Sequence, residues 1–496
     1  MPPRKVGRVP SPLPLTRRVP DWLILTIACL GQFMVVLDVS VVNVALPSIR
    51  THLHYSPAGL QWVVNAYVLT FAGFLLLGGR VADLLGSRRV FVFGVGLFSL
   101  ASLVGGFSTS PGMLTAARAV QGLGGAVLAP VTLTVIMTTF TEGSARTRAL
   151  GAWSAVAGGG GGVGVVLGGI LTTSLSWRWV LFINVPIGLA LGVAAARYLS
   201  STRRPTKGQL DVAGALTITG GLAALVYAIV GTDTHPWGSA HTLGFLAAAA
   251  VLIGSFLAIQ AKFARAPLMP LRLFRSRALS AANGTQLLFG GAFFAMWYFV
   301  SLYLQDIHRY DALRAGLAVF PMCVGIVVGA QITIRLVPRF GPRNVLLFGL
   351  PVCAVGFWWL SQLSVTSSYV GGVLGPGILI SLGLGLCVTP IATAATNGVA
   401  RDEAGLASGV VTTSRQVGGS IGLAVLATLA TDRTTGLLRA GHDPIPAFAA
   451  GYDRAFLVSA GFIVAATLCA TLLPTRQHLA TAGPRQARRA PAEANA

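Results

Sequence analysis

Long apolar segments follow one another along most of the chain, and short polar or basic stretches separate them. A helix needs about 20 mostly apolar residues to cross a bilayer, and each of these segments comes close to that length or exceeds it. The pattern therefore predicts fourteen membrane-spanning helices. They are expected at residues 22–46, 59–78, 89–107, 112–139, 149–172, 178–196, 210–230, 241–261, 279–304, 314–334, 344–361, 369–396, 404–430 and 454–474.

The composition favours a membrane protein over a water-soluble enzyme. Of 496 residues, 54% are hydrophobic and 10% are charged, and the mean hydropathy is +0.74, whereas about 25% of the residues of a soluble domain are charged. We therefore expect an all-α polytopic protein embedded in the lipid bilayer. The chain has no Gly-Lys-Ser/Thr sequence of a P-loop, no HExxH and no CxxC pair. We expect no enzymatic activity, no metal site and no cofactor. Because the chain has no ATP-driven motor of its own, its energy comes either from a gradient, for which we expect protons, or from another subunit.

The chain is strongly basic, with 36 Lys and Arg against 14 Asp and Glu, and a net charge of +22. In a soluble protein this excess would suggest nucleic-acid binding. Here most basic residues fall in the loops on the side of the two termini, which is typical of cytoplasmic loops. We expect no nucleic-acid partner and both termini in the cytoplasm. The excess of Arg over Lys and the many Ala and Gly residues indicate a bacterial plasma membrane.

A short internal repeat divides the chain. Residues 80–94 (RVADLLGSRRVFVFG) and 335–349 (RLVPRFGPRNVLLFG) share six of fifteen positions, and each copy follows a span, eight spans apart. Repeats in the same orientation predict two parallel six-helix bundles. The expected parts are a tail at 1–20, bundles at 21–200 and 278–475, two linking spans within 201–277, and a basic tail at 476–496. Chance similarity between basic loops is the alternative.

Two parallel bundles are the architecture of a rocker-type secondary transporter. In such proteins a small-molecule substrate binds between the halves, near the middle of the membrane. We expect this protein to bind a small molecule and protons, and to act as a monomer.

One acid and one base lie at matching depth inside the spans. Asp38 is about 24 Å along its span from Trp22, and Arg118 is about 9 Å from the outer end of its own span. Charges inside a membrane are costly and are usually functional. We expect Asp38 to bind either a proton or a cationic substrate, and Arg118 to influence how easily Asp38 loses its proton. A static ion pair that only fixes helix packing is the alternative.

Arg415 is a third charge within a span, about 16 Å from the inner end and without an acid at comparable depth. It binds either backbone carbonyls or an anionic part of a substrate. Further polar and aromatic residues are candidates to line a cavity for a large amphipathic ligand. With Asp38 and Arg415, the predicted substrate-binding residues are Asn43, Tyr67, Gln121, Gln286, Trp297 and Tyr298.

Two glycine-containing segments are candidate gates. In residues 79–89 (GRVADLLGSRR), Gly79 and Gly86 permit tight backbone geometry, and Asp83 is placed to cap a helix or to pair with basic neighbours. The basic residues of this loop are Arg80, Arg88 and Arg89. Orientation by positive charge alone is the alternative. In the fifth span, Gly164 and Gly168 share a helix face that favours close packing and would also make the helix pliable during a conformational switch.

Four segments resemble a known family over about residues 20–475. They are Leu37–Pro47 (LDVSVVNVALP), residues 79–89, Arg118 with Gln121, Gly122 and Gly124, and Ser176–Gly188 (SWRWVLFINVPIG). These segments are similar to motifs of the major facilitator superfamily, specifically its fourteen-helix drug:proton antiporters. The resemblance implies export of hydrophobic drugs or antibiotics against proton entry, and it associates the Arg118 segment with proton coupling.

The chain departs from the family pattern at two places. Val165 follows Gly164 where the fifth-helix antiporter motif has Gly-Pro, which weakens the argument for antiport from that motif. Pro338 occupies the place of Asp83 in the second repeat, so an acid-dependent gate would work on one side only.

Together these features predict a proton-coupled exporter of amphipathic, cationic or neutral drugs or antibiotics. In this hypothesis Asp38 is the site for the proton and the cation, Arg118 is its coupling partner, and residues 79–89 form the inner gate. One alternative is a proton-coupled importer, or an exporter of anionic compounds, with the same fold. A second is a membrane receptor or scaffold that transports nothing.

Overall fold

The computed structural model describes residues 20–140, 144–199, 210–265, 267–396 and 404–474. Within these ranges the secondary structure is helical and contains no strand, so the predicted all-α class is confirmed. The α-helices are α1 (Asp21–Leu53), α2 (Pro57–Leu60), α3 (Trp62–Leu85), α4 (Ser87–Gly106), α5 (Pro111–Thr139), α6 (Ser144–Ser174), α7 (Trp179–Phe182), α8 (Asn184–Tyr198), α9 (Val212–Val230), α10 (Ala240–Ala258), α11 (Arg277–Asp306), α12 (Ala312–Leu360), α13 (Gly375–Thr396), α14 (Ala404–Arg439) and α15 (Pro444–Thr471). Short 3-10 or π segments are η1 (Gly231–Asp233), η2 (Ile259–Phe263), η3 (Leu271–Arg275) and η4 (Tyr369–Leu374).

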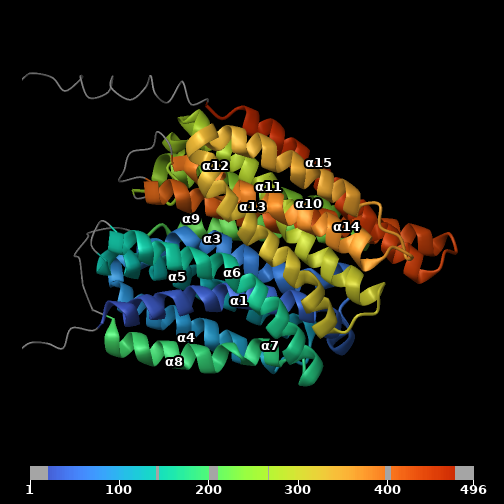
Figure 1. Ribbon diagram of the computed structural model, residues 1–496, viewed down its shortest axis with the longest axis horizontal. Helices are drawn as coiled ribbons and strands as arrows, with labels where there is room; N and C mark the ends of the chain where they lie inside the picture. The colour runs from blue at the N-terminus through green and yellow to red at the C-terminus, as the bar shows by residue number, and fades with distance from the viewer. Residues whose placement is uncertain (1–19, 141–143, 200–209, 266, 397–403, 475–496) are drawn as a thin grey trace, which may run out of the picture.

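The long helices run side by side in two groups (Figure 1). Helices α1 to α8, blue to green, form the N-terminal bundle, and α11 to α15, yellow to red, form the C-terminal bundle. The first and last described residues lie at the same end of the molecule. We call this the terminal end, and the opposite one the far end.

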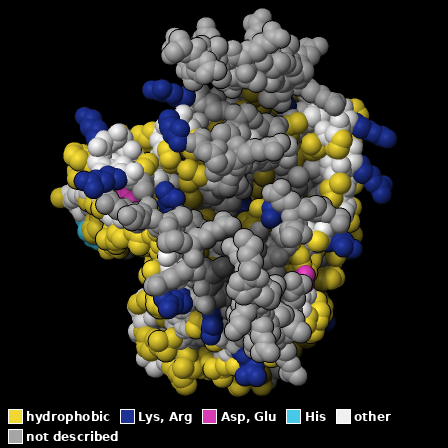
Figure 2. All heavy atoms as spheres, turned by 90° about the vertical axis from the view of Figure 1, so that its left-hand side faces the viewer, with side chains coloured by type: hydrophobic (Ala, Val, Ile, Leu, Met, Phe, Trp, Pro, Cys, Tyr) yellow, Lys and Arg dark blue, Asp and Glu magenta, His cyan; other side chains and the backbone are white. Residues whose placement is uncertain are grey.

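Basic side chains gather at the terminal end. Figure 2 looks onto this end, where Lys and Arg side chains stand around the rim and hydrophobic side chains cover the flanks. Apolar flanks are what a protein surrounded by lipid presents to the acyl chains.

Helices α9 and α10 form a hairpin beside the bundles. Helix α10 packs on α9, while α9 contacts both α3 of the N-terminal bundle and α14 of the C-terminal bundle. Val226 of α9 is buried with Leu69 of α3 and Ala424 of α14. The Thr428 hydroxyl of α14 donates to the carbonyl oxygen of Ile229 at 3.2 Å. Helix α9 therefore lies along the seam between the two bundles on the α3–α14 side.

Twelve of the described helices are long and apolar enough to cross a membrane. One of them, α12, has 49 residues, which is about 73 Å of helix and more than twice the roughly 30 Å of a bilayer core. Helix α12 covers both predicted spans at 314–334 and 344–361, whereas α14, which covers the span predicted at 404–430, is not among the twelve. The count of fourteen spans therefore stays a prediction.

The two glycines that the internal repeat aligns share one backbone conformation. Gly86, between α3 and α4, has φ 87° and ψ 141°, and Gly341, within α12, has φ 79° and ψ 158°. A side chain is strained at such positive φ values. Both copies of the repeat thus use glycine for the same sharp turn, and α12 consists of two helices joined at Gly341.

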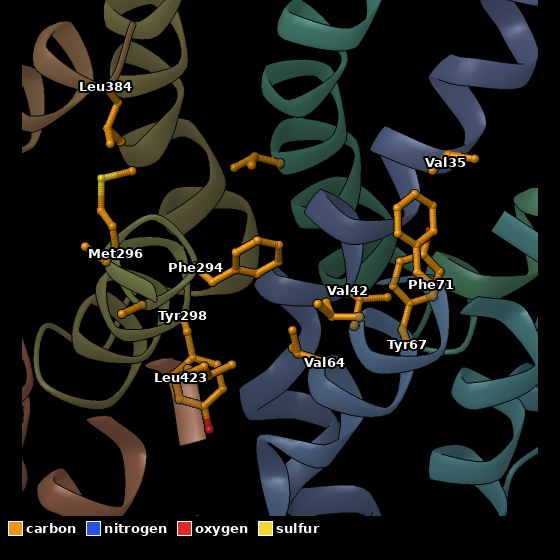
Figure 3. Close-up of a cluster of buried hydrophobic side chains, with 14 of the residues drawn as sticks. Val35, Val42, Val64, Tyr67, Phe71, Phe294, Met296, Tyr298, Leu384 and Leu423 are labelled. Carbon is orange, nitrogen blue, oxygen red and sulfur yellow. The ribbon is translucent and has the colours of Figure 1, made fainter. Parts of the chain in front are cut away.

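A shared hydrophobic core joins the two bundles. Buried side chains of both bundles belong to one cluster, and Figure 3 shows Phe294 of α11 pointing toward Val42 and Val64 of the N-terminal bundle. The space between the bundles is filled by apolar side chains at this level.

Glycines bring helices α11 and α14 into backbone contact. A Cβ atom at Gly418 of α14 would overlap the carbonyl oxygen of Leu287 in α11, and one at Gly422 would overlap the backbone of Gly291. Apolar helices gain little from leaving lipid, so close packing of small residues is a main source of helix association in membranes.

We expect Gly418→Ala to destabilise the protein by about 1–3 kcal/mol, because the added methyl group forces α11 and α14 apart. The measurement is the midpoint of thermal unfolding of the purified protein in detergent. Gly461→Ala on α15 is the matched control, since a Cβ atom there meets nothing within 4 Å. Equal midpoints for the two variants would contradict this account of the packing.

Candidate functional site

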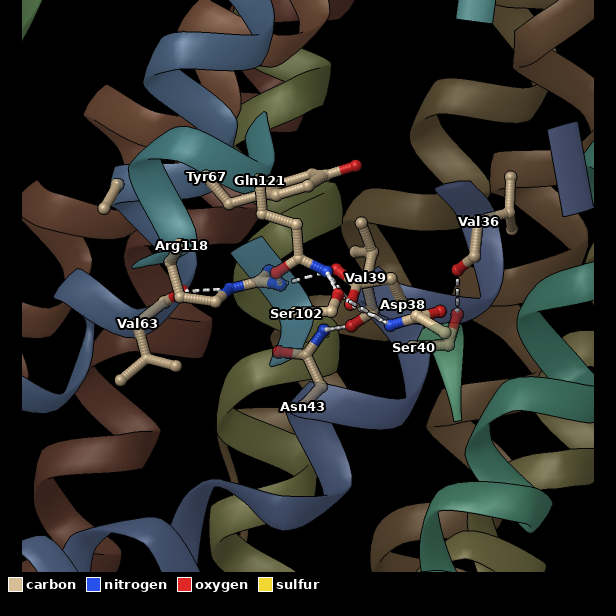
Figure 4. Close-up of polar contacts among 12 residues, drawn as sticks. Val36, Asp38, Val39, Ser40, Asn43, Val63, Tyr67, Ser102, Arg118 and Gln121 are labelled. Atoms are coloured by element: carbon tan, nitrogen blue, oxygen red, sulfur yellow. Dashed lines mark hydrogen bonds and ion pairs between the residues drawn. The ribbon is translucent and has the colours of Figure 1, made fainter. Parts of the chain in front are cut away.

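Asp38 of α1 and Arg118 of α5 form a buried ion pair. The side chain of Asp38 is 0% exposed and that of Arg118 is 2% exposed. Nη1 of Arg118 donates to Oδ2 of Asp38 at 2.5 Å, as the dashed lines of Figure 4 show. The two residues expected at matching depth are thus in direct contact.

Other groups hold the Arg118 guanidinium in place. Its Nε donates to the carbonyl oxygen of Val63 at 3.0 Å, and Nη1 also donates to Oε1 of Gln121 at 2.7 Å. The ring of Tyr67 lies 4.4 Å from Cζ of Arg118, where the π-electrons of the ring attract a cation. Since Val63 and Tyr67 belong to α3, the guanidinium links α3 with α5 and α1.

Gln121, Ser102 and Asn184 complete the surroundings of Asp38. Nε2 of Gln121 donates to Oδ1 of Asp38 at 2.6 Å and to the Ser102 hydroxyl at 2.6 Å. Nδ2 of Asn184 donates to the same Oδ1 at 3.0 Å and to the Ser102 hydroxyl at 3.3 Å. Four helices, α1, α4, α5 and α8, therefore meet at one carboxylate.

The sequence prediction did not include Ser102 or Asn184. Asn184 lies in the segment 176–188, and an amide within an otherwise apolar stretch is a signal that sequence reasoning can use. Ser102 gives no comparable signal, because its hydroxyl is satisfied as easily by its own helix as by a distant partner.

This network compensates a carboxylate that lies out of reach of water. Burial of an uncompensated charge costs several kcal/mol, and here one cation and two amides offset that cost. When Asp38 takes up a proton, Arg118 keeps the Val63 carbonyl, the Gln121 amide oxygen and the face of Tyr67. The contacts of Arg118 with α3 and with Gln121 thus do not depend on the charge of Asp38.

Two atoms beside the network have no hydrogen-bond partner among the described residues. They are Oη of Tyr67 and Oδ1 of Asn184, and both are buried. Such atoms are the usual partners of an internal water molecule, so Tyr67 and Asn184 each offer one polar atom to water beside the network.

The remaining predicted cavity residues lie apart from this network, in α1 and α11. They are Asn43, Gln286, Trp297 and Tyr298. The Asn43 amide donates to the carbonyl oxygen of Val39 at 2.9 Å, Tyr298 is buried against Phe299, and Trp297 is half-buried. A hollow of about 340 Å³ at the far end is lined by other residues, including Thr51, Thr172, Gln305 and Asp311.

Arg415 of α14 is half-buried. Its Nε is buried and has no hydrogen-bond partner within the described ranges. The expected backbone carbonyl partner is therefore not found there, and Arg415 does not reach the Asp38 network.

The loop expected to form the inner gate lies at the terminal end, where α3 turns into α4. Gly79 and Arg80 belong to α3, and Gly86 makes the turn. Arg80 and Arg89 are exposed and Arg88 is half-buried. The side chain of Asp83 lies outside the described part, so its pairing stays a prediction.

The glycines of α6 divide between two neighbours. Gly164 and Gly168 face α1 of the same bundle, with a Cβ at Gly164 placed 2.7 Å from Cβ of Ser40. Gly162 and Gly169 face α12 of the other bundle, with a Cβ at Gly169 placed 2.7 Å from the Ala312 carbonyl oxygen. The predicted packing role thus fits Gly164 and Gly168, while the face of α6 that meets the other bundle carries Gly162 and Gly169.

A second ion pair joins the bundles at the far end. Arg50 of α1 donates to both oxygens of Asp306 in α11, at 2.6 and 3.2 Å, and the Tyr452 hydroxyl of α15 donates to Asp306 at 2.7 Å. The side chains of Arg50 and Asp306 are 23% and 13% exposed. We call these three residues the far-end contact.

Backbone acceptors of α1 strengthen the far-end contact. The Ser301 hydroxyl donates to the Asn43 carbonyl oxygen, and Nε2 of Gln305 donates to the Val44 carbonyl oxygen, both at 3.0 Å. Helices α1 and α11 are therefore bonded over two turns, and the bundles are closed against each other on this side. The sequence prediction missed this contact, because no local pattern relates residues 256 positions apart.

We expect Arg118→Met to destabilise the protein by about 3–5 kcal/mol, because it leaves the buried carboxylate of Asp38 without its cation. Adding Asp38→Asn to the same chain removes that charge, so the double variant recovers much of the loss. Thermal midpoints of the wild type, both single variants and the double variant form the test, with Arg439→Met at the end of α14 as the exposed control. A double variant no more stable than Arg118→Met would contradict the pairing.

We expect Asp306→Asn to shift the protein toward forms open at the far end, because the amide no longer attracts Arg50. The measurement is the distance distribution between spin labels at Thr51 of α1 and Leu438 of α14. Longer distances gain population in the variant, while Asp311→Asn at the exposed start of α12 changes nothing. Identical distributions in Asp306→Asn and wild type would show that the contact does not hold the far end closed.

Comparison with known proteins gives a family match and similar relatives over most of the chain. The sequence model described as Major Facilitator Superfamily matches residues 28–423. The cephamycin export protein CmcT of Amycolatopsis lactamdurans is 44% identical, over 91% of this chain and 92% of that protein. The puromycin resistance protein pur8 of Streptomyces alboniger is 39% identical, over 91% of this chain and 90% of that protein.

Solved structures share the fold at low sequence identity. A point mutant of the nucleoside transporter NupG superposes with a TM-score of 0.65 and 12% identity, over 90% of this chain and 99% of that one. A bacterial homolog of the human lysosomal transporter Spinster, in an inward-facing and unoccupied conformation, superposes with a TM-score of 0.62 and 16% identity. The match covers 91% of this chain and 97% of that one. The family match and the two relatives agree: the chain belongs to the major facilitator superfamily, as a multi-pass membrane transporter and not an enzyme.

Proposed function

We propose that this protein is a proton-coupled exporter of amphipathic antibiotics or other drugs. The names of its relatives describe export of cephamycin, resistance to puromycin, and resistance to and export of tetracenomycin C. The multidrug resistance protein Stp of Mycobacterium tuberculosis is 34% identical over 421 residues. Two of these names state export and the other two state resistance to drugs, which together support export of a toxic compound as the function of this chain.

The proposal places fourteen spans in a bacterial plasma membrane, with the terminal end in the cytoplasm. Division of α12 at Gly341 and addition of α14 to the twelve apolar helices give this number. The basic rim of the terminal end (Figure 2) supports the orientation, since Arg and Lys accumulate on cytoplasmic surfaces.

The observation that carries proton coupling is the Asp38 network. Asp38 is fully buried among side chains of four helices, and both of its oxygens accept hydrogen bonds. A proton fits there without moving any of these helices, whereas an amphipathic cation would have to separate them. We therefore assign the proton to Asp38 and place the substrate elsewhere in the interface between the bundles.

Protonation and bundle movement are linked through Arg118. Loss of the Asp38 charge weakens the bond between α1 and α5 and leaves α3 and α5 joined through the Val63 carbonyl and Tyr67. Helix α1 also carries Arg50 of the far-end contact, so a change in how α1 is held reaches the surface where the bundles meet. Opening at the far end releases the substrate outside the cell. Closure at the far end then makes the substrate site accessible from the cytoplasm again.

We expect Asp38→Asn to abolish proton-driven transport, because asparagine keeps the size of the side chain but binds no exchangeable proton. The substrate is first chosen from a panel of amphipathic antibiotics by its toxicity to cells with and without the protein. Uptake of that compound into energised inside-out vesicles is then compared between variants. Asp311→Asn is the control, since Asp311 caps α12 at the surface and asparagine caps equally well.

Two outcomes would defeat different parts of this proposal. If uptake driven by the pH gradient is unchanged in Asp38→Asn, the assignment of the coupling proton to Asp38 is wrong. If the wild-type protein transports no compound in either direction, the proposed export function is wrong and a receptor is favoured.

A further inference from the structure

Polar atoms without partners gather where α11 and α14 pack together. Within the described residues, Oε1 of Gln286, Oγ1 of Thr413 and Nε of Arg415 are buried and make no hydrogen bond. At the Asp38 network, by contrast, the carboxylate and its cation are fully bonded. Buried polar groups in proteins nearly always have a partner, so an unpaired group of them requires an explanation.

Gln286 and Arg415 lie at one level of the helix pair. Arg415 is about 16 Å into α14 and Gln286 about 14 Å into α11, counted from the terminal end. A Cβ atom at Gly290 of α11 would overlap the Arg415 carbonyl oxygen, and Gln286 precedes Gly290 by one turn on the same face. Next to them, the Ser414 hydroxyl donates to Oδ1 of Asn283 at 2.7 Å and fixes the register of the pair.

The face of α14 that carries Arg415 is turned toward the other bundle. Gly419 follows Arg415 by one turn on this face and packs against Phe294. Phe294 in turn points toward Val42 and Val64 of the N-terminal bundle (Figure 3). Arg415 therefore borders the interface between the bundles, near the middle of the membrane.

The missing partner has the chemistry of an anion. A guanidinium is charged at every physiological pH, and an unpaired charge inside a membrane protein is costly to keep. No ion pair of Arg415 is found in the described part of the chain. Its planar set of N–H donors matches the paired oxygens of a carboxylate or sulfonate, and the side-chain amide of Gln286, at the same level of the helix pair, has N–H donors for the same group.

We propose that Arg415, with Gln286, binds an anionic oxygen group of the transported compound. The inference rests on the proposed export function and narrows it: the substrates are amphiphiles that carry one carboxylate or sulfonate. The two bundles then have separate tasks, with the proton at Asp38 in one and the charged group of the substrate at Arg415 in the other.

The test compares two probes that differ in one group. 8-Anilinonaphthalene-1-sulfonate and N-phenyl-1-naphthylamine share the same two aromatic parts, and only the first carries a sulfonate. Equilibrium binding of both tritiated probes to the purified full-length protein is measured by scintillation proximity without a proton gradient. The wild type is expected to bind the sulfonate at least about tenfold more tightly, as one charged hydrogen-bonded pair provides.

Variants assign the preference to Arg415. Arg415→Gln is expected to lose the preference for the sulfonate while it binds the neutral probe as the wild type does, and Arg415→Lys is expected to keep part of it. Arg439→Met retains the full preference, because Arg439 is exposed at the opposite end of α14 from the proposed site. Binding of the neutral probe shows that each variant is folded.

The proposal is overturned if the wild type binds both probes equally, or if Arg415→Gln keeps the preference. Neither result bears on proton-driven export, which the vesicle experiment with Asp38→Asn measures separately. Unchanged proton-driven export in Asp38→Asn, beside a wild-type preference for the sulfonate that Arg415→Gln removes, would leave the anion site standing and overturn the coupling scheme.

Discussion

The cost of keeping a charge away from water governs the arrangement of the N-terminal bundle. Asp38 is completely buried, and its charge is tolerable only because Arg118, Gln121 and Asn184 converge on it from neighbouring helices. Each partner must hold its position for the others to be satisfied. The network therefore fixes the mutual placement of α1, α4, α5 and α8, with α3 attached through Val63.

The same cost is met differently at two other charged sites. At the far end, Arg50 and Asp306 neutralise each other across the boundary between the bundles, so the balance holds only while the bundles touch. At Arg415 no described residue supplies the opposite charge. One charge is thus neutralised within a bundle, one is neutralised between the bundles, and one has no opposite charge among the described residues; in our proposals these three sites serve proton coupling, closure and substrate recognition.

Much of the fold follows from the sequence because spans are set by length and hydropathy. The matching depths of Asp38 and Arg118 follow from the rise of a helix, and the turn at Gly341 follows from its alignment with Gly86.

The partners Ser102 and Asn184 lie far from Asp38 in sequence, and which helices become neighbours of α1 depends on tertiary packing. Arg50 and Asp306 resemble ordinary residues at helix ends until the bundles are placed together. Predictions about cavity residues were less complete for a related reason, since a polar or aromatic residue in a span avoids lipid equally by packing, as with Tyr298, and by binding.

The position of α9 has a mechanical consequence. Because it packs on α3 and accepts a hydrogen bond from α14, this helix fills one side of the boundary between the bundles along its length. At the other boundary between the bundles, α6 packs directly on α12 through Gly169 and Gly316. Any movement that separates α3 from α14 therefore has to break the contacts of α9 with at least one of them, so the hairpin adds a resistance that the two bundles alone would lack.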